Sequence, residues 1–547
     1  MKQKIERTVE PNVKTDMADI WKALLEKDAD IWKEAQASAR NDENKKRILV
    51  ATSMGCYDHG VILETALSVA LTLRGAHIDV LLCDRFLPCC QMTKYFSVSP
   101  AELLSQEHTP RCAGCDEKGN RFYSTLGLPI YWYSQWVPER LREQAKTISR
   151  TVPYSQIGDY RYDGLAVGEH ARAGALRYYS RGDMTGEPEH EPILRRFLES
   201  ALLTAFAVGN LLRMNAYDSV VFHHGIYVPQ GVIGEVCRQK GVHVVNWNPS
   251  YRNQTFIFSH DDSYHHTMIT EPVEEWENIP WTGALETQTL EYLKSRWYGT
   301  GDWIWFHESP QDDPITIAQT LGIDFNQPCI GMLSSVMWDA QLHYASNAFK
   351  NMLDWVLQTI AYFSQRPDLQ LILRVHPAEV RGMIPARQKL ADEIRNVLPS
   401  LPPNIFIVPP ESEISTYALM EKCNAVIIYN TKTGIELSSM GIPVIVAGEA
   451  WIRNKGFSRD ASSPAEYFAI LDQLPFPGRL KDEQVERARK YAYHFFFRRM
   501  IDVPFVVNVK KFKFALNLAS IRELLPGVNP GVDVICEGIL EKTPFIQ

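Results

Sequence analysis

The segment from Tyr429 to Val444 combines residue types that suit phosphate and sugar chemistry. An apolar run ends there in a short polar loop, and a helix is predicted to follow. Backbone amides at the start of a helix, with threonine hydroxyls beside them, can bind a phosphate. A carboxylate one turn into the helix can accept hydrogen bonds from ribose hydroxyls. The candidate residues for binding a nucleotide and its phosphate here are Asn430, Thr431, Thr433, Gly434 and Glu436. The alternative is a capping loop with a helix-stabilising glutamate.

A second candidate motif, Arg374-Val-His376-Pro377, ends another apolar run. Arginine and histidine at the carboxyl end of a strand can bind a diphosphate or phosphodiester and offset the charge of a leaving group. A His-Pro pair alone is common. Its position one strand–helix unit ahead of the glutamate motif favours a shared site for Arg374, His376 and Glu436.

A catalytic base would be expected in the first half of the chain. Asp58 and His59 follow a predicted strand, in the loop before a helix, although His59-Gly60 is also ordinary turn chemistry. His223 and His224 end another predicted strand, and His224 is the candidate that would face an acceptor. Either histidine could instead be a satisfied polar residue at a strand end. These residues could remove a proton from an acceptor hydroxyl.

Four cysteines form a separate candidate site: Cys89, Cys90, Cys112 and Cys115. The two-residue spacing of Cys112 and Cys115 lets both thiolates reach one ion, and thiolates with tetrahedral preference suggest structural Zn²⁺. Cys83 could replace one of the adjacent pair, because neighbouring side chains point apart. An iron–sulfur cluster would use similar ligands, and simple unliganded thiols are the remaining alternative.

Alternating strands and helices must position these residues. Short apolar runs typical of buried parallel strands occur at 47–52, 78–83, 219–223, 242–246, 329–333, 369–375, 405–408, 425–429 and 443–446. Helical patterns fill the gaps at 61–74, 192–214, 229–239, 343–364, 385–397, 414–421 and 432–440. This order predicts an α/β fold with two Rossmann-like domains in series that face a cleft, and ligands bind beyond the carboxyl ends of such strands.

The domain limits follow from the same pattern. We expect a helical N-terminal extension at 1–45, a first Rossmann-like domain at 46–320, a second Rossmann-like domain at 321–490, and a tail at 491–547 that packs back across the domains. Residues 84–190, which hold the cysteine cluster and show few clear periodicities, are interpreted as an insertion in the first domain. A chain of 547 residues is too long for one hydrophobic core.

The donor-domain motifs resemble those of the bacterial capsule polysaccharide biosynthesis proteins. The likeness rests on Arg374-Val-His-Pro-Ala-Glu379, Asn430-Thr-Lys-Thr-Gly-Ile-Glu436, Gly448-Glu-Ala-Trp-Ile-Arg-Asn-Lys-Gly456 and Gly331-Met-Leu-Ser-Ser-Val-Met-Trp-Asp339. It implies a GT-B glycosyltransferase whose C-terminal domain holds the donor nucleotide, with Ser334 and Ser335 in its first loop. Some members use a CMP-activated eight-carbon ulosonic acid (Kdo). This chain has Asn430-Thr-Lys-Thr433 where the family loop is more often of an Asn-Ser-Thr type.

Composition narrows the function classes. The formal net charge of −8 argues against nucleic acid as a partner. We see no apolar stretch of about 20 residues and no secretory signal, so we expect a cytoplasmic protein. Aromatic and basic residues at 494–499 and 509–514 could rest on an anionic membrane surface, which would make the protein peripheral to the inner membrane. Packing of this tail against the protein is the simpler interpretation.

The predicted function is glycosyl transfer from a CMP-, UDP-, GDP- or dTDP-linked sugar to an oligosaccharide or lipid-linked glycan of the cell surface. A nucleotide-sugar epimerase or hydrolase on the same plan is the first alternative. The second is a non-catalytic scaffold of a polysaccharide-assembly complex.

Overall fold

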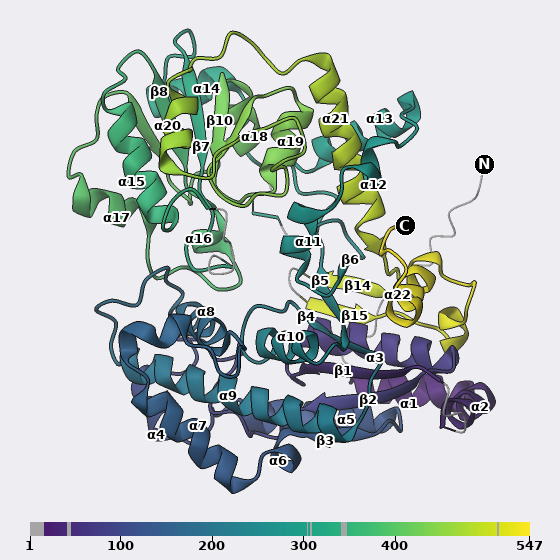
Figure 1. Cartoon of the computed structure of the whole chain (residues 1–547). Helices are drawn as coiled ribbons and strands as arrows, with labels where there is room; N and C mark the ends of the chain where they lie inside the picture. The colour runs from purple at the N-terminus through teal and green to yellow at the C-terminus, as the bar shows by residue number, and fades with distance from the viewer. Residues whose placement is uncertain (1–15, 41–44, 304, 307–308, 341–346, 511–512) are drawn as a thin grey trace.

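Two separate sheets, one in each half of the chain, organise the structure (Figure 1). This computed structural model describes residues 16–40, 45–303, 305–306, 309–340, 347–510 and 513–547. Parts of the predicted 1–45 extension, of the predicted 343–364 helix and of the 509–514 segment lie outside the described residues. The predicted α/β class with parallel sheets is confirmed.

Seven strands of the described chain form the first sheet, in the order β13-β6-β5-β4-β1-β2-β3. They are β1 (Arg47–Ser53), β2 (His77–Leu82), β3 (Ile130–Trp132), β4 (Ser219–His223), β5 (His243–Pro249), β6 (Thr255–His260) and β13 (Ile501–Asp502). Strands β1 to β5 run parallel, while β6 is antiparallel to both β5 and β13. The predicted strands are β1, β2, β4 and β5. Their carboxyl ends therefore lie along one edge of the sheet.

The second sheet, within the described residues, has six parallel strands in the order β12-β11-β10-β7-β8-β9. They are β7 (Cys329–Leu333), β8 (Gln370–Arg374), β9 (Ile405–Val408), β10 (Ala425–Ile428), β11 (Val444–Val446) and β12 (Arg459–Asp460). Five of these six strands are predicted from sequence, because each is a short apolar run. The edge strand β12 is short and polar, and was missed.

Helices cover both sheets. In the first half they are α1 (Met17–Lys27), α2 (Ala29–Arg40), α3 (Asp58–Leu73), α4 (Pro100–Ser105), α5 (Cys112–Thr125), α6 (Tyr133–Trp136), α7 (Glu139–Thr151), α8 (Val167–Tyr179), α9 (His190–Met214), α10 (Gln230–Gln239), α11 (Tyr264–Thr270), α12 (Glu274–Glu277) and α13 (Gly283–Ser295). In the second half they are α14 (Pro314–Leu321), α15 (Met352–Phe363), α16 (Ala378–Arg381), α17 (Leu390–Val397), α18 (Thr416–Glu421), α19 (Thr433–Ser439), α20 (Pro464–Leu471), α21 (Asp482–Tyr493) and α22 (Pro530–Glu541).

Residues 84–190 are built into the first domain. Strand β3 pairs with β2 and extends the sheet, and side chains from this segment share one core with α9 and β4, among them Tyr133, Tyr178 and Tyr179. The interpretation of this segment as an insertion is therefore not supported. Its one strand has three residues, which leaves little periodicity to detect in the sequence.

The C-terminal segment crosses back to the first domain (Figure 1). After α21, strand β13 pairs with β6, and α22 contributes Ile535 and Ile539 to the core around α3. Phe495 and Phe496 are fully buried, so the described part of the aromatic stretch packs inside the protein. The extension also packs on α3, where the indole of Trp21 donates to Thr65 Oγ1 (3.0 Å).

Helix α9 is the one described helix that is long and apolar enough to span a membrane by length and composition. Two thirds of its apolar window is buried within the protein. Ala201, Leu202 and Val208 are fully buried in the core of the first domain. Its hydrophobicity is therefore explained by its place as a core helix.

Candidate functional site

A cavity of about 380 Å³ opens beyond the carboxyl ends of β7, β8 and β10. Its opposite wall comes from the segment between Tyr251 and Phe306, which links the two sheets. Seven of the predicted donor-site residues line it: Ser334, Ser335, Arg374, His376, Asn430, Thr431 and Thr433. The motifs on separate strand ends therefore meet at one place, as expected for parallel strands.

His376 is held in a defined orientation. Its backbone amide donates to Ser334 Oγ (3.1 Å), and the amide of Ala378 donates to His376 Nδ1 (3.0 Å). Burial, with the nearby charge of Lys432, lowers the pKa of His376 to about 4. The neutral ring therefore carries its proton on Nε2, since Nδ1 is an acceptor. His376 presents a neutral N–H donor rather than the charge predicted for it.

Arg374 has a different role from the one predicted. Its side chain is almost completely buried and donates to Pro409 O, to Ser412 O (3.0 Å) and to Thr416 Oγ1 (3.4 Å). Burial lowers its pKa to about 10, so it remains charged near neutral pH. These contacts tie the loop before α18 to the end of β8. Arg374 thus shapes the wall while most of its donors are already engaged.

The loop after β10 offers fewer backbone amides to a ligand than predicted. The amide of Thr433 is taken by Thr431 Oγ1 (3.3 Å), and α19 has only seven residues. Gly434 does not line the cavity; a Cβ there would lie 2.7 Å from Ile428 and Ile452, so close packing accounts for the glycine. Asn430 Oδ1 is buried with no hydrogen-bond partner among the described residues.

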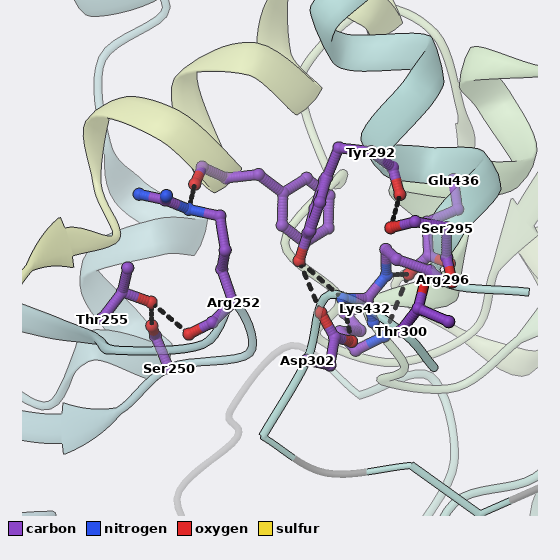
Figure 2. Close-up of polar contacts among 11 residues, drawn as sticks. Ser250, Arg252, Thr255, Tyr292, Ser295, Arg296, Thr300, Asp302, Lys432 and Glu436 are labelled. Atoms are coloured by element: carbon purple, nitrogen blue, oxygen red, sulfur yellow. Dashed lines mark hydrogen bonds and ion pairs between the residues drawn. The ribbon is translucent and has the colours of Figure 1, made fainter. Parts of the chain in front are cut away.

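Glu436 lies behind the cavity wall, inside a cluster of four charges with Arg296, Asp302 and Lys432 (Figure 2). Glu436 Oε1 is 2.9 Å from Lys432 Nζ and 3.2 Å from Arg296 Nε. Arg296 also pairs with Asp302 (2.5 Å). The Glu436 side chain is 2% exposed, so the predicted direct contact with a ribose is not what the structure places there: its carboxylate is occupied by two cations.

Two neighbouring cations keep the Glu436 carboxyl of this cluster ionised. Burial alone would raise the pKa of Glu436, but the charges of Arg296 and Lys432 lower it to about 2. Burial raises the pKa of Asp302 despite Arg296. Tyr292 joins these groups, because its hydroxyl donates to Asp302 Oδ1 (2.8 Å) and accepts from Arg296 (2.9 Å). The cluster fixes the segment carrying Arg296 and Asp302 to α19 of the second domain.

Aromatic rings form much of the remaining wall. Trp297 stacks on Tyr417, with ring centroids 5.6 Å apart and planes 6° apart. Phe306 meets the His376 ring edge-on at 5.5 Å, and Tyr251 lies under Lys432 Nζ at 4.6 Å. Flat apolar faces beside polar donors suit a ligand with both a ring and an anionic group. Trp297, Trp303 and Trp305 stand close together in the sequence, and two of them, Trp297 and Trp305, line this wall.

The predicted catalytic residues Asp58, His59 and His224 do not line the cavity. His59 packs against Phe514, with ring centroids 3.9 Å apart, and burial lowers its pKa to about 4. Asp58 is exposed at the start of α3. His224 has a φ of 64° and its ring lies 5.9 Å from that of His265. The strand-end prediction thus located the edge of the first sheet, but its three residues are not among those that line the cavity.

Three other proton acceptors do line the cavity: His265, Asp339 and Glu449. His265 comes from α11, after the last consecutive strand of the first sheet. Asp339 accepts a hydrogen bond from Tyr227 of the first domain (2.7 Å). Sequence analysis missed His265, and its only signal was the His265-His266 doublet after an unrecognised antiparallel strand.

Comparison with known proteins identifies the segment that carries this site. Residues 318–470 match the family described as capsule polysaccharide biosynthesis protein. The resemblance drawn from the motifs is confirmed. The matched capsule-family segment contains β7 to β12, and with them every predicted donor-site residue. No curated protein matches the chain.

Solved structures give only distant likenesses. The KpsC β-Kdo 2,4-transferase of Thermosulfurimonas dismutans has 14% identity and a TM-score of 0.32, covering 50% of this chain and 79% of that one. UDP-GlcNAc 2-epimerase from Neisseria meningitidis, bound to UDP-GlcNAc, has 12% identity and a TM-score of 0.26, covering 91% and 100%. Similarity at this level does not distinguish one activity from another.

The cysteines lie outside the capsule-family segment. Cys89 Sγ contacts Ser200 Oγ (3.4 Å), Cys112 Sγ contacts Thr109 Oγ1 (3.3 Å), and Cys115 Sγ accepts from the amide of Cys56 (3.4 Å). In the described parts of the chain, no three or more histidine, cysteine or acidic side chains are grouped so as to hold a metal ion. The zinc site predicted at Cys89, Cys90, Cys112 and Cys115 is therefore not supported.

Proposed function

We propose that this chain is a glycosyltransferase that transfers a sugar from a nucleotide-sugar donor to a growing surface glycan. One observation carries the proposal. The residues of the capsule-family segment that suit phosphate binding, including Ser334, His376 and Thr431, line one cavity, and the segment from Tyr251 to Phe306 closes it from the other side.

The reaction needs a stabilised leaving group. The acceptor hydroxyl oxygen forms a bond to the anomeric carbon of the sugar, and the bond from that carbon to the nucleotide phosphate oxygen breaks. Negative charge grows on the phosphate as it leaves, and donors already in place lower the barrier. His376 Nε2–H and the hydroxyls of Thr431 and Thr433 are the neutral donors for it.

The acceptor hydroxyl also loses a proton. His265, Asp339 and Glu449 are the groups of the cavity wall that can take it. Burial lowers the pKa of His265 to about 3, so its ring is neutral and can accept. The acceptor enters from the side of the first domain, where His265 and Tyr227 lie. The donor is a CMP-, UDP-, GDP- or dTDP-linked sugar, and the acceptor is an oligosaccharide or lipid-linked glycan on the cytoplasmic side of the inner membrane.

The test is turnover of a panel of nucleotide sugars with and without a glycan acceptor. We expect release of free nucleotide only when the acceptor is present, with the sugar recovered on the glycan. Conversion of the donor without acceptor would identify an epimerase or hydrolase. Tight nucleotide binding with no turnover under any condition would identify a scaffold, and either result would contradict the proposal.

A further inference from the structure

Three cations lie at the wall of the donor cavity, and their surroundings differ. Arg374, Arg296 and Lys432 all line it. Arg374 donates to the loop before α18, as described above. Arg296 is engaged by Asp302, Tyr292 and Glu436, and its side chain is 4% exposed. Neither guanidinium can turn toward a ligand without giving up buried hydrogen bonds.

Lys432 keeps donor capacity for a ligand. Its side chain is 15% exposed, and Glu436 is the one described residue whose oxygen accepts from its ammonium (2.9 Å). An ammonium has three N–H groups, so two remain. The ring of Tyr251 lies 4.6 Å from Nζ and supports the charge from one side. Lys432 also follows Thr431 directly, in the loop that faces the cavity.

The carboxylates of the cluster stay paired when Lys432 binds a phosphate. Arg296 stays paired with Glu436 at 3.2 Å and with Asp302, so a phosphate that engages Lys432 does not leave Glu436 as an unpaired buried carboxylate. The charge of Lys432 also contributes to the lowered pKa of His376, so the two groups act on the same space. A phosphate between them would receive a charge-assisted hydrogen bond from Lys432 and a neutral one from His376.

We propose that Lys432 is the cation that binds the phosphate of the donor, and that Glu436, fixed by Arg296, is a positioning residue that holds the ammonium at the cavity wall. This inference rests on the proposed function and adds the residue that recognises the anionic group. Glu436 therefore acts on donor binding through Lys432 rather than by contact with a ribose.

The first experiment compares nucleotides with their nucleosides by isothermal titration calorimetry. The probes are the nucleotides that the candidate donors release, CMP, UDP, GDP and dTDP, each beside its nucleoside, on the wild type, Lys432→Met, Lys432→Arg and Lys422→Met. Lys422 is an exposed lysine of the same domain and serves as the matched control. We expect Lys432→Met to raise the Kd of the preferred nucleotide by at least about 10-fold, as loss of a charge-assisted hydrogen bond implies. The nucleoside Kd should change by less than about 2-fold, and Lys432→Arg should recover most of the loss.

Equal nucleotide affinity in the wild type and Lys432→Met would overturn the inference while leaving the proposed function standing. Absence of nucleotide binding by the wild type would overturn both.

A second measurement needs no variant: acetic anhydride labelling of the wild type, read by peptide mass spectrometry. The preferred nucleotide should protect Lys432 at least about 5-fold more than its nucleoside does, because Nζ would donate to the phosphate. Equal labelling with both would contradict the inference.

Discussion

Each domain buries a glutamate on the helix that follows a strand of its sheet, and the two carboxyls differ in charge. Glu64 of α3 accepts from the hydroxyl of Thr52, from Trp247 Nε1 (2.9 Å) and from Tyr123 (3.2 Å). These partners are neutral, and burial raises the pKa of Glu64 to about 7. Glu436 of α19 has two cations as partners, and its pKa falls to about 2. A buried acid is thus protonated or charged according to its neighbours, some of which, such as Trp247 and Arg296, lie far away in sequence.

The same contrast separates the two sheet edges. In the second domain the strand-end residues Ser334, His376 and Thr431 reach a cavity. In the first domain the corresponding residues contact one another: Tyr57 hydrogen-bonds His223 (2.9 Å), and His59 packs on Phe514. A polar residue at the carboxyl end of a parallel strand is therefore a candidate for a site, and the packing of other segments decides whether it reaches one.

The largest expected effect tests the charged cluster. Glu436→Ala leaves Arg296 and Lys432 without their shared carboxylate and should reduce the free energy of unfolding by about 3–5 kcal/mol. Glu413→Ala is the control, because Glu413 is 58% exposed in its pair with Arg381 and should cost about 0–1 kcal/mol. Urea unfolding of both variants measures the difference. Equal losses of unfolding free energy in the two variants would contradict the expected difference between buried and exposed ion pairs.

The pH dependence of the other glutamate comes next. A folded-state pKa of about 7 for Glu64, above the ordinary value of 4.5, means that the folded protein binds more protons than the unfolded chain between these pH values. Stability should therefore fall as pH rises from 4.5 to 7, by about 3 kcal/mol from this group. The opposite sign applies to Glu436, whose contribution is lost as pH falls from 4.5 toward 2.

Glu64→Gln checks this sign, because it removes the titrating group and keeps the acceptor oxygen. Urea unfolding at pH 5 and pH 7.5 should show a smaller decline in the variant than in the wild type. The same decline in both proteins would mean that Glu64 does not titrate in this range.

A third prediction compares histidines at the carboxyl-end edges of the two sheets. His376→Ala removes the Nε2 donor and should lower kcat/KM for the nucleotide sugar about 100-fold, as loss of one preorganised donor does. His59→Ala, outside the cavity, should change kcat/KM by less than about 3-fold, because the donors that line the cavity stay in place. Steady-state rates with the identified donor and acceptor measure both. A comparable loss in His59→Ala would return the catalytic role to the first domain.

The smallest effect concerns the cysteines. Cys112→Ser should change the free energy of unfolding by less than about 0.5 kcal/mol, because its contact in the described structure is one hydroxyl. Metal content per chain, measured by mass spectrometry, should be the same in variant and wild type. Loss of a stoichiometric metal in the variant would restore the zinc or iron–sulfur interpretation.

Sequence patterns were sufficient for the central strands and for the motifs at their ends. Val426 to Ile428 or Leu371 to Leu373 are apolar because helices cover both faces of the sheet, and this burial is visible in a single sequence. Short or antiparallel strands such as β3, β6, β12 and β13 leave no comparable pattern.

The rest of the site depends on segments that are distant along the chain and meet only in the folded protein. Arg296, Asp302 and His265 belong to the segment that connects the sheets, and their role arises because this segment folds over the cavity. Lys432, one helical turn before Glu436, is a local signal, whereas Arg296 pairs with Glu436 only through the fold. The sequence therefore identifies the donor wall but neither the opposite wall nor the charge state of its groups.

The most direct test is a crystal structure of the protein with the nucleotide that binds most tightly. We expect the phosphate in the cavity of the second domain, with its oxygens within hydrogen-bond distance of His376 Nε2 and Lys432 Nζ, and the base among the aromatic rings near Phe306. A nucleotide bound at the strand ends of the first domain, or elsewhere on the surface with this cavity empty, would contradict the account.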